Sequence, residues 1–117
     1  MNNEPTSLFE LAPKRLQWLS SRQKAVSENI ANSDVAGFRA KEVESFASYL
    51  DNARATSTLE PAKVQEAKTS WSEDLTGNNV VLEEQLMEAN STAGQFRIAA
   101  GLYRKAYEML GTVVGRR

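Results

Sequence analysis

Residues 82–114 of the chain, LEEQLMEANSTAGQFRIAAGLYRKAYEMLGTVV, decide its fold. Apolar residues recur at every third or fourth position of this stretch, which is the pattern of a coiled-coil seam. No proline interrupts the pattern. We therefore predict a single α-helix of roughly 50 Å, at a rise of about 1.5 Å per residue. The predicted seam consists of Leu82, Leu86, Ala89, Ala93, Phe96, Ala100, Tyr103, Tyr107, Leu110 and Val114.

A second amphipathic stretch near the N-terminus is the expected cover for this seam. Its apolar face comprises Leu16, Leu19, Val26 and Ile30. Thr6 or Ser7 can cap the start of the helix, with Glu10 as the capping-box partner of Ser7. Pro13 removes a backbone donor and conflicts with an unbroken helix, so we expect a short turn and then a regular helix from about residue 14.

A stretch of lower apolar content separates the two predicted helices. Residues 32–37 favour a helix stop followed by a glycine turn. The alternation in residues 38–43 suggests an extended segment, and residues 45–50 suggest a short helical turn. Residues 51–76 form a loop or are ordered by neighbours, because their apolar residues are isolated. Trp71 is the one large apolar residue among them, and it could anchor the stretch onto the helix pair or onto another subunit.

These segments predict an all-α fold in which two long terminal helices form an antiparallel coiled-coil hairpin. We assign residues 1–35 to the N-terminal helix, residues 36–76 to the turn and the irregular middle segment, and residues 77–117 to the C-terminal helix. The last begins with the turn Gly77-Asn78-Asn79, in which an asparagine is expected to cap the long helix. A two-helix hairpin leaves about half of each helix uncovered. We therefore expect a marginally stable monomer that receives further helices from other subunits.

The composition excludes several classes of function. The chain has no histidine and no cysteine, which removes disulfides, thiolate and imidazole chemistry and most zinc sites. A net charge of −1 gives no gross attraction to nucleic acid, and no apolar run of about 18 residues predicts a membrane span. The polar N-terminus lacks the features of a cleaved signal peptide. We expect no cofactor, no metal and no small-molecule substrate.

Charge is unevenly distributed along the predicted C-terminal helix. Glu83, Glu84 and Glu88 lie near its start, and basic residues gather towards its end. Both groups complement the helix dipole. We interpret the glutamates as solvated rather than as a metal or acid–base site. The basic cluster is either a solvated face or a surface that pairs with acidic neighbours.

Two motifs in the chain resemble a known family. The segments 29–32 and 37–40 are similar to the signature near the N-terminus of bacterial flagellar rod and hook proteins. The matching residues are Asn29, Ile30, Ala31, Asn32, Gly37, Phe38 and Ala40. Val35-Ala36 stands where the family has Thr-Pro, so the turn is less pre-set here. Residues 77–83 are similar to the start of the long helix in proximal rod proteins, and the short chain indicates a small rod protein.

The resemblance implies a structural subunit of the flagellar basal body that is required for motility. Such a subunit builds the proximal rod with copies of itself and with other rod proteins. The resemblance also implies contact with the adaptor between ring and rod and with the flagellar type III export gate, and a periplasmic location reached without a cleaved signal peptide. The motif residues are expected to contact adjacent subunits. The alternatives are another small rod protein and a free-standing cytoplasmic coiled-coil interaction module.

Overall fold

The computed structural model describes residues 7–55, 59–68 and 75–115. The elements follow one another as α1 (Leu8–Ala31), β1 (Lys41–Val43), α2 (Phe46–Ala55), β2 (Val64–Glu66) and α3 (Leu82–Gly115). The prediction of a mostly helical chain with two long terminal helices that pack together is confirmed. The fold is all-α only approximately, because β1 and β2 form a small antiparallel sheet that pairs Lys41 with Glu66 and Val43 with Val64.

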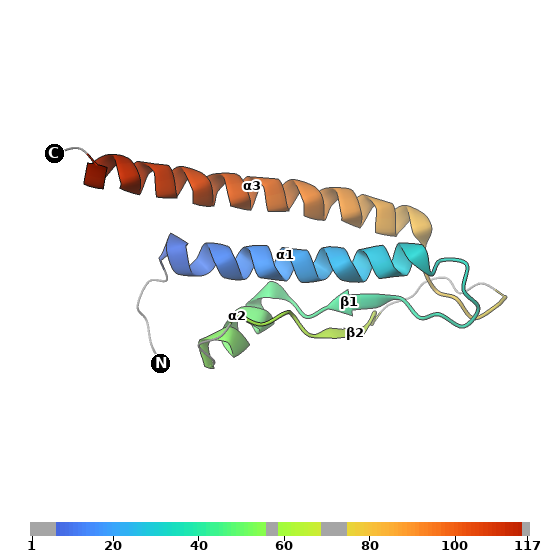
Figure 1. Ribbon diagram of the computed structural model, residues 1–117. Coiled ribbons are helices and arrows are strands. Elements are labelled where there is room, and N and C mark those ends of the chain that lie inside the picture. The colour runs from blue at the N-terminus through green and yellow to red at the C-terminus, as the bar shows by residue number, and fades with distance from the viewer. Residues whose placement is uncertain (1–6, 56–58, 69–74, 116–117) are drawn as a thin grey trace.

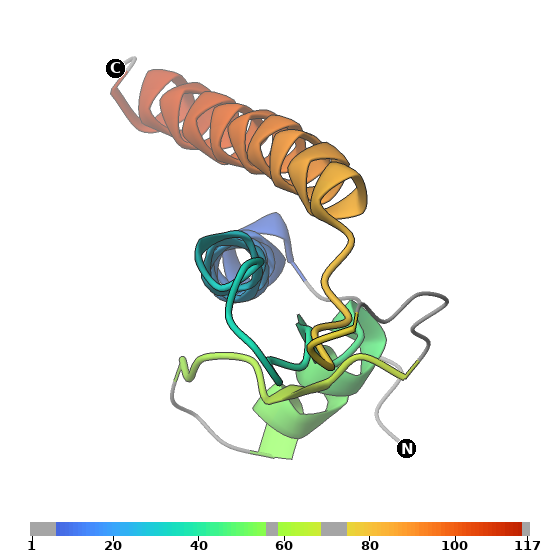
Figure 2. The same cartoon turned by 90° about the vertical axis from the view of Figure 1, so that its right-hand side faces the viewer.

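Helix α1 lies in the middle of the molecule. Helix α3 runs antiparallel along one side of it, and α2 with the two strands covers another side (Figure 1). The view along the helices shows the same three layers, with α1 between α3 and the small sheet (Figure 2). Leu19 of α1 is completely buried and Val26 nearly so. The chain is therefore organised around α1, whereas the sequence pattern pointed to the C-terminal helix.

The beginning of α1 differs from the prediction. The helix starts at Leu8 and continues through Pro13, so the expected separate turn before residue 14 is wrong. The hydroxyl of Ser7 caps the first turn by accepting a hydrogen bond from a backbone N–H. The Phe9 ring packs edge-on against Tyr107 of α3, with 5.4 Å between ring centroids. These two contacts hold the first turn and offset the one backbone hydrogen bond that the proline removes.

The middle segment is ordered because it folds back onto α1. Trp18, Leu19, Tyr49 and Ala62 form the buried core cluster, and Phe46 packs against it. Helix α2 is accordingly longer than the short turn predicted at residues 45–50. The predicted extended segment at residues 38–43 is confirmed in part, as strand β1. Trp71, the expected anchor, lies outside the described residues.

Glu44 connects the middle segment to α1. Its carboxylate accepts hydrogen bonds from the backbone N–H of Lys63 at 2.6 Å, from the Ser48 hydroxyl at 3.1 Å and from the Asn52 side chain at 3.2 Å. Its carbonyl oxygen accepts one from the Trp18 indole at 2.7 Å. A buried carboxylate requires such partners. This residue therefore holds β1, α2 and the returning strand together.

Candidate assembly surface and the asparagine junction

Four asparagines tie the end of α1 to the start of α3. We call Asn29, Asn32, Asn78 and Asn79 the asparagine junction. Asn29 is completely buried. Its amide accepts a hydrogen bond from the Lys41 N–H at 2.9 Å and donates one to the Lys41 carbonyl at 2.8 Å, as a neighbouring strand would.

Asn78 and Asn79 join the turn after α1 to the turn before α3. Asn78 donates its side-chain amide to the carbonyl oxygens of Asn32 and Val35, at 2.9 Å and 2.8 Å. The Asn79 side chain accepts from the backbone N–H of Ala40 at 2.5 Å. The prediction that one of them caps α3 is therefore wrong. Their side chains bond to the first turn, and Asn78 also accepts a hydrogen bond from the Val80 N–H at 2.8 Å, whereas the residue directly before α3 is Val81.

Glycine permits the turn on each side of the junction. Gly37 and Gly77 both adopt positive φ angles, of 76° and 85°, which other residues adopt only with strain. The Gly37 N–H donates to the carbonyl of Thr76 at 2.9 Å, so the two turns lie side by side. The glycine turn predicted at position 37 is confirmed by this backbone conformation.

The structure places the family-like motif residues mainly inside this junction. Asn29 and Ala40 are buried, while Ile30, Asn32 and Phe38 are half-buried. Ala31 and Gly37 are exposed. Because Asn29 and Ala40 are buried, their side chains cannot contact an adjacent subunit in this fold. Subunit contact by the rest of the motif stays a prediction.

Hydrogen bonds contribute to the contact between α1 and α3. Asn29 donates to the Gln85 side chain at 3.0 Å, and Gln23 donates to the Ala89 carbonyl at 3.3 Å. Gln85 and Thr92 are the buried polar residues of α3 in this contact, and Thr92 is only 1% exposed. These two residues are spaced by one heptad, so they mark the line of α3 that faces α1. The predicted apolar seam named neither of them.

The predicted seam lies beside this line rather than on it. Leu82, Leu86, Phe96, Tyr107 and Leu110 are exposed, with Leu86 at 48% and Leu110 at 47%. The alanines of the seam and Tyr103 are half-buried, and the side chain of Val114 lies outside the described part of the structure. On α1 the predicted face is better placed. Leu19 and Val26 are buried, and Leu16 and Ile30 are half-buried.

Helix α3 carries large apolar side chains that remain at least 39% exposed in the described residues, on two sides of the line that faces α1. We call this set of side chains the α3 stripe. It consists of Leu82, Leu86, Met87, Phe96, Ile98, Leu102, Tyr107, Met109, Leu110 and Val113. At about 100° per residue, Leu86, Phe96 and Tyr107 lie on one side of the helix and Met87, Ile98 and Leu102 on the opposite side, so the stripe has two exposed faces. Exposed apolar patches mark interaction sites in proteins. The stripe is the strongest candidate for a functional site.

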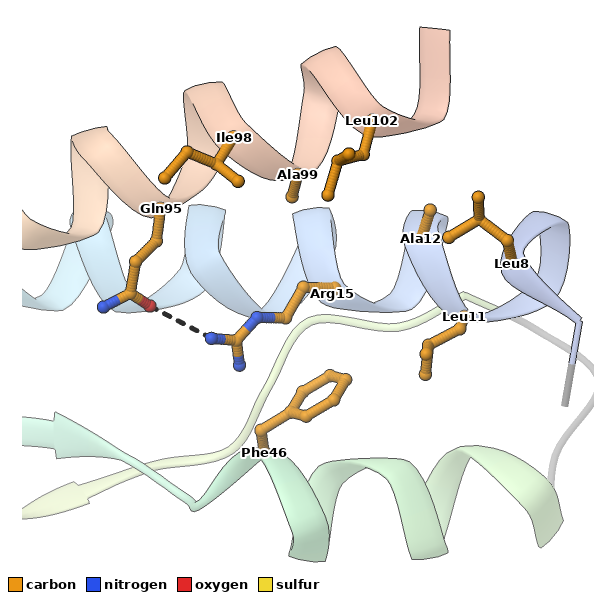
Figure 3. Close-up of a pocket in the computed structure, with 9 residues that line it drawn as sticks. All are labelled: Leu8, Leu11, Ala12, Arg15, Phe46, Gln95, Ile98, Ala99 and Leu102. Atoms are coloured by element: carbon orange, nitrogen blue, oxygen red, sulfur yellow. Dashed lines mark hydrogen bonds between the residues drawn. The ribbon is translucent and has the colours of Figure 1, made fainter. Parts of the chain in front are cut away.

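A groove opens beside the stripe, between the first half of α1 and residues 95–102 of α3. It has a volume of about 380 Å³. Figure 3 shows apolar side chains of both helices around it, with Phe46 of α2 on the far side. Arg15 is the one charged side chain among the lining residues. The groove is thus an apolar hollow with a single cation.

Aromatic rings hold the guanidinium of Arg15 in this groove. It lies 4.9 Å from the Trp18 ring centroid and 4.8 Å from that of Phe46, within cation–π range. It also donates a hydrogen bond to Gln95 at 3.0 Å. Burial, and then the positive charge of Arg22, lower the pKa of Arg15. An anion beside Arg15 would offset both effects.

The described residues show no arrangement suited to catalysis by a metal. They contain no cluster of three or more acidic side chains that could hold a metal ion. None of the helices in the described ranges has the length and apolar character needed to cross a membrane.

Comparison with known proteins identifies the family. Residues 11–39, which cover most of α1 and the glycine turn, match the family model described as flagella basal body rod protein. The whole chain is similar to the flagellar basal body rod protein FlgB of Agrobacterium fabrum. The two are 30% identical, and the alignment covers 97% of this chain and 96% of that protein. The chain belongs to the flagellar basal body rod protein family.

Membership of this family confirms the predicted class of function. A flagellar basal body rod protein is a structural subunit of the flagellum and not an enzyme. The resemblance expressed by Asn29, Asn32 and Gly37 is confirmed too, because the matched residues include all three. The cytoplasmic coiled-coil module, the alternative from the sequence, is set aside by the same finding.

Proposed function

We propose that this rod subunit occupies the proximal part of the rod and assembles through the α3 stripe. In the proposal, the stripe packs as a coiled coil on helices of neighbouring subunits, which are copies of this chain and other rod proteins. The observation that carries the proposal is the exposure of the stripe along the full length of α3. The similarity of the whole chain to a rod protein supports the choice of neighbours.

The energetics favour assembly over an isolated hairpin. Fully burying an exposed large apolar side chain contributes about 1.5–3 kcal/mol, and the ten side chains of the stripe retain 39–74% of their exposure. The contact between α1 and α3 already combines the buried Leu19 and the Phe9 ring with three hydrogen bonds. Each hydrogen bond contributes only about 0.5–1.5 kcal/mol net, or somewhat more for the charged donor of Arg15. The larger gain therefore becomes available when a neighbouring helix covers the stripe.

The remaining expectations form part of the same proposal. The subunit would reach the periplasm through the flagellar type III export gate without cleavage of a signal peptide. It would then contact the adaptor that joins the membrane ring to the rod. Copies arranged by non-closing contacts produce a helical shaft of this kind.

A charge placed on the stripe tests the proposal. Leu110 is 47% exposed, so Leu110→Asp should leave the isolated fold largely intact. It should nevertheless abolish swimming in soft agar and remove the protein from isolated basal bodies, because a buried carboxylate in a helix contact is costly. Immunoblots of the cell, the exported fraction and the basal bodies separate failed assembly from failed export.

Thr112→Asp is the matched control, since it adds the same charge to an exposed polar position of the same helix. Normal motility is expected for this variant. Wild-type swimming by Leu110→Asp, with normal amounts in basal bodies, would refute the role of the stripe. Retention of the wild-type protein in the cytoplasm, whether or not the export apparatus is intact, would refute the proposed location.

A further inference from the structure

The groove beside α1 holds a positive charge that the described part of the chain does not neutralise. Arg15 donates one hydrogen bond, to the neutral amide of Gln95. A guanidinium has five N–H donors and favours carboxylate partners, yet no carboxylate of the described residues pairs with it. Arg22 adds to the positive potential, because its guanidinium lies 5.6 Å from the same Trp18 ring. The positive charge of Arg15 in the groove therefore lacks an acidic partner among the described residues.

Apolar walls surround this cation. Ile98 is 66% exposed and Leu102 is 57% exposed on one wall, and Leu8 is 43% exposed on the other. Figure 3 shows these side chains flanking the hollow, with the guanidinium of Arg15 at one end of it. A fitting occupant must offer apolar side chains with a carboxylate between them. An amphipathic helix with a glutamate on its apolar face has that chemistry.

The start of α3 carries such a face. Leu82, Leu86 and Met87 are exposed, with Met87 at 72%. Glu83 precedes Leu86 and Met87 by three and four positions, so its side chain lies beside theirs on the helix surface. Glu83 is itself exposed and forms no hydrogen bond or ion pair within the described ranges.

The charges of α3 also favour contact between its two halves in different molecules. Residues 82–96 contain glutamates and no lysine or arginine, whereas residues 97–105 contain three basic residues and no acidic one. Opposite potentials of this kind steer association and fix its register. Ile98 and Leu102 of the basic stretch line the groove, although its three basic side chains do not, and the acidic stretch carries the Glu83 face.

We propose that the groove around Arg15 in one copy receives the Leu82–Met87 turn of α3 from a second copy, with Glu83 paired to Arg15. The proposal rests on the proposed function for its place in the rod and names the contact by which copies join. The Leu82–Met87 turn lies at the start of α3, whereas residues 95–102, which line the groove, lie in its middle. The contact is therefore heterologous, and each added copy leaves a new groove or a new Glu83 face free.

Charge reversal at the exposed side of the pair is the first test. Glu83→Arg places two cations together, so we expect self-association of the full chain, measured by sedimentation velocity, to weaken by at least about tenfold. Glu84→Arg is the matched control, because it makes the same charge change about 100° further round the helix. The double variant Arg15→Glu with Glu83→Arg should recover much of the lost association.

Disulfide trapping keeps the test decisive if Arg15→Glu fails to fold. The natural chain has no cysteine, so a mixture of Glu83→Cys and Ile98→Cys chains can form a mixed disulfide only across a contact between copies. We expect a strong mixed product from this pair and little from Glu84→Cys with Ile98→Cys. Equal association of the two arginine variants, or equal trapping by the two cysteine pairs, overturns the proposed contact.

The test of the Glu83–Arg15 contact and the test of the proposed function can fail independently of each other. If Glu83→Arg leaves self-association unchanged while the wild-type protein is found in basal bodies, the contact is wrong and the rod role stands. If the wild-type protein is absent from basal bodies but the Glu83–Arg15 contact forms in solution, the rod role is wrong and the contact stands.

Discussion

Asn29 is the residue at which the family signature and the fold meet. Its side chain forms three hydrogen bonds, two with the backbone of Lys41 and one with Gln85. An asparagine is required because the site needs both a donor and an acceptor in one short side chain. The motif thus secures the return of the chain after α1, in keeping with the helix stop and glycine turn predicted from the sequence, while its contact with other subunits stays a prediction.

We predict that Asn29→Asp destabilises the fold by about 2–3 kcal/mol. The substitution keeps the size of the side chain but replaces the donor with an oxygen that faces the Lys41 carbonyl and the Gln85 oxygen. Urea unfolding followed by circular dichroism measures the loss. Asn90→Asp adds the same charge at an exposed position of α3 and should change stability little. Equal effects of the two variants would contradict the assigned role of Asn29.

The positions of the helices could be predicted from the sequence more easily than the side of each helix that packs against the rest of the chain. The length of α3 and its start at Leu82 follow from an unbroken pattern of period 3.6. The side that faces α1 does not follow, because two polar residues mark it: Gln85 accepts a hydrogen bond from Asn29, and the buried Thr92 hydroxyl has no hydrogen-bond partner in the described residues. Only the seven-residue spacing of these two polar residues hinted at that line. The pairing of β2 with β1 left no signal either, since the side chains of β2 are all exposed and show no alternation.

At the level of elements, we predict that Glu44→Ala releases the middle segment from α1. The change removes the carboxylate that accepts hydrogen bonds from Lys63, Ser48 and Asn52, and each such charged bond contributes about 1.5–3 kcal/mol. Hydrogen exchange should accelerate at least about tenfold in residues 59–68, with little change in α3. Glu66→Ala, an exposed acidic residue of β2, serves as the control. Equal acceleration in both variants would argue against Glu44 as the connector.

The whole molecule is elongated, with a small core around Trp18 and Leu19 and exposed apolar side chains along α3. It measures 67 × 31 × 19 Å. Helix α3 has 34 residues against 24 in α1, and it extends past the start of α1 (Figure 1). The overhanging end carries Met109, Leu110 and Val113, all exposed. This geometry suits a subunit whose stability is completed by its neighbours.

We therefore predict that the isolated protein is only partly helical when it is dilute. Isolated helices owe most of their stability to packing of an apolar face, and the α3 stripe has no cover in a single copy. Far-UV circular dichroism at low micromolar concentration should show much less helix than α1 and α3 require. The helical signal should rise with concentration, because association covers the stripe. Raising the ionic strength should lessen that rise if the Glu83–Arg15 pair contributes, since salt screens exposed charges. A fully helical monomer with one cooperative melting transition would show instead that the contact between α1 and α3 stabilises both helices without neighbours.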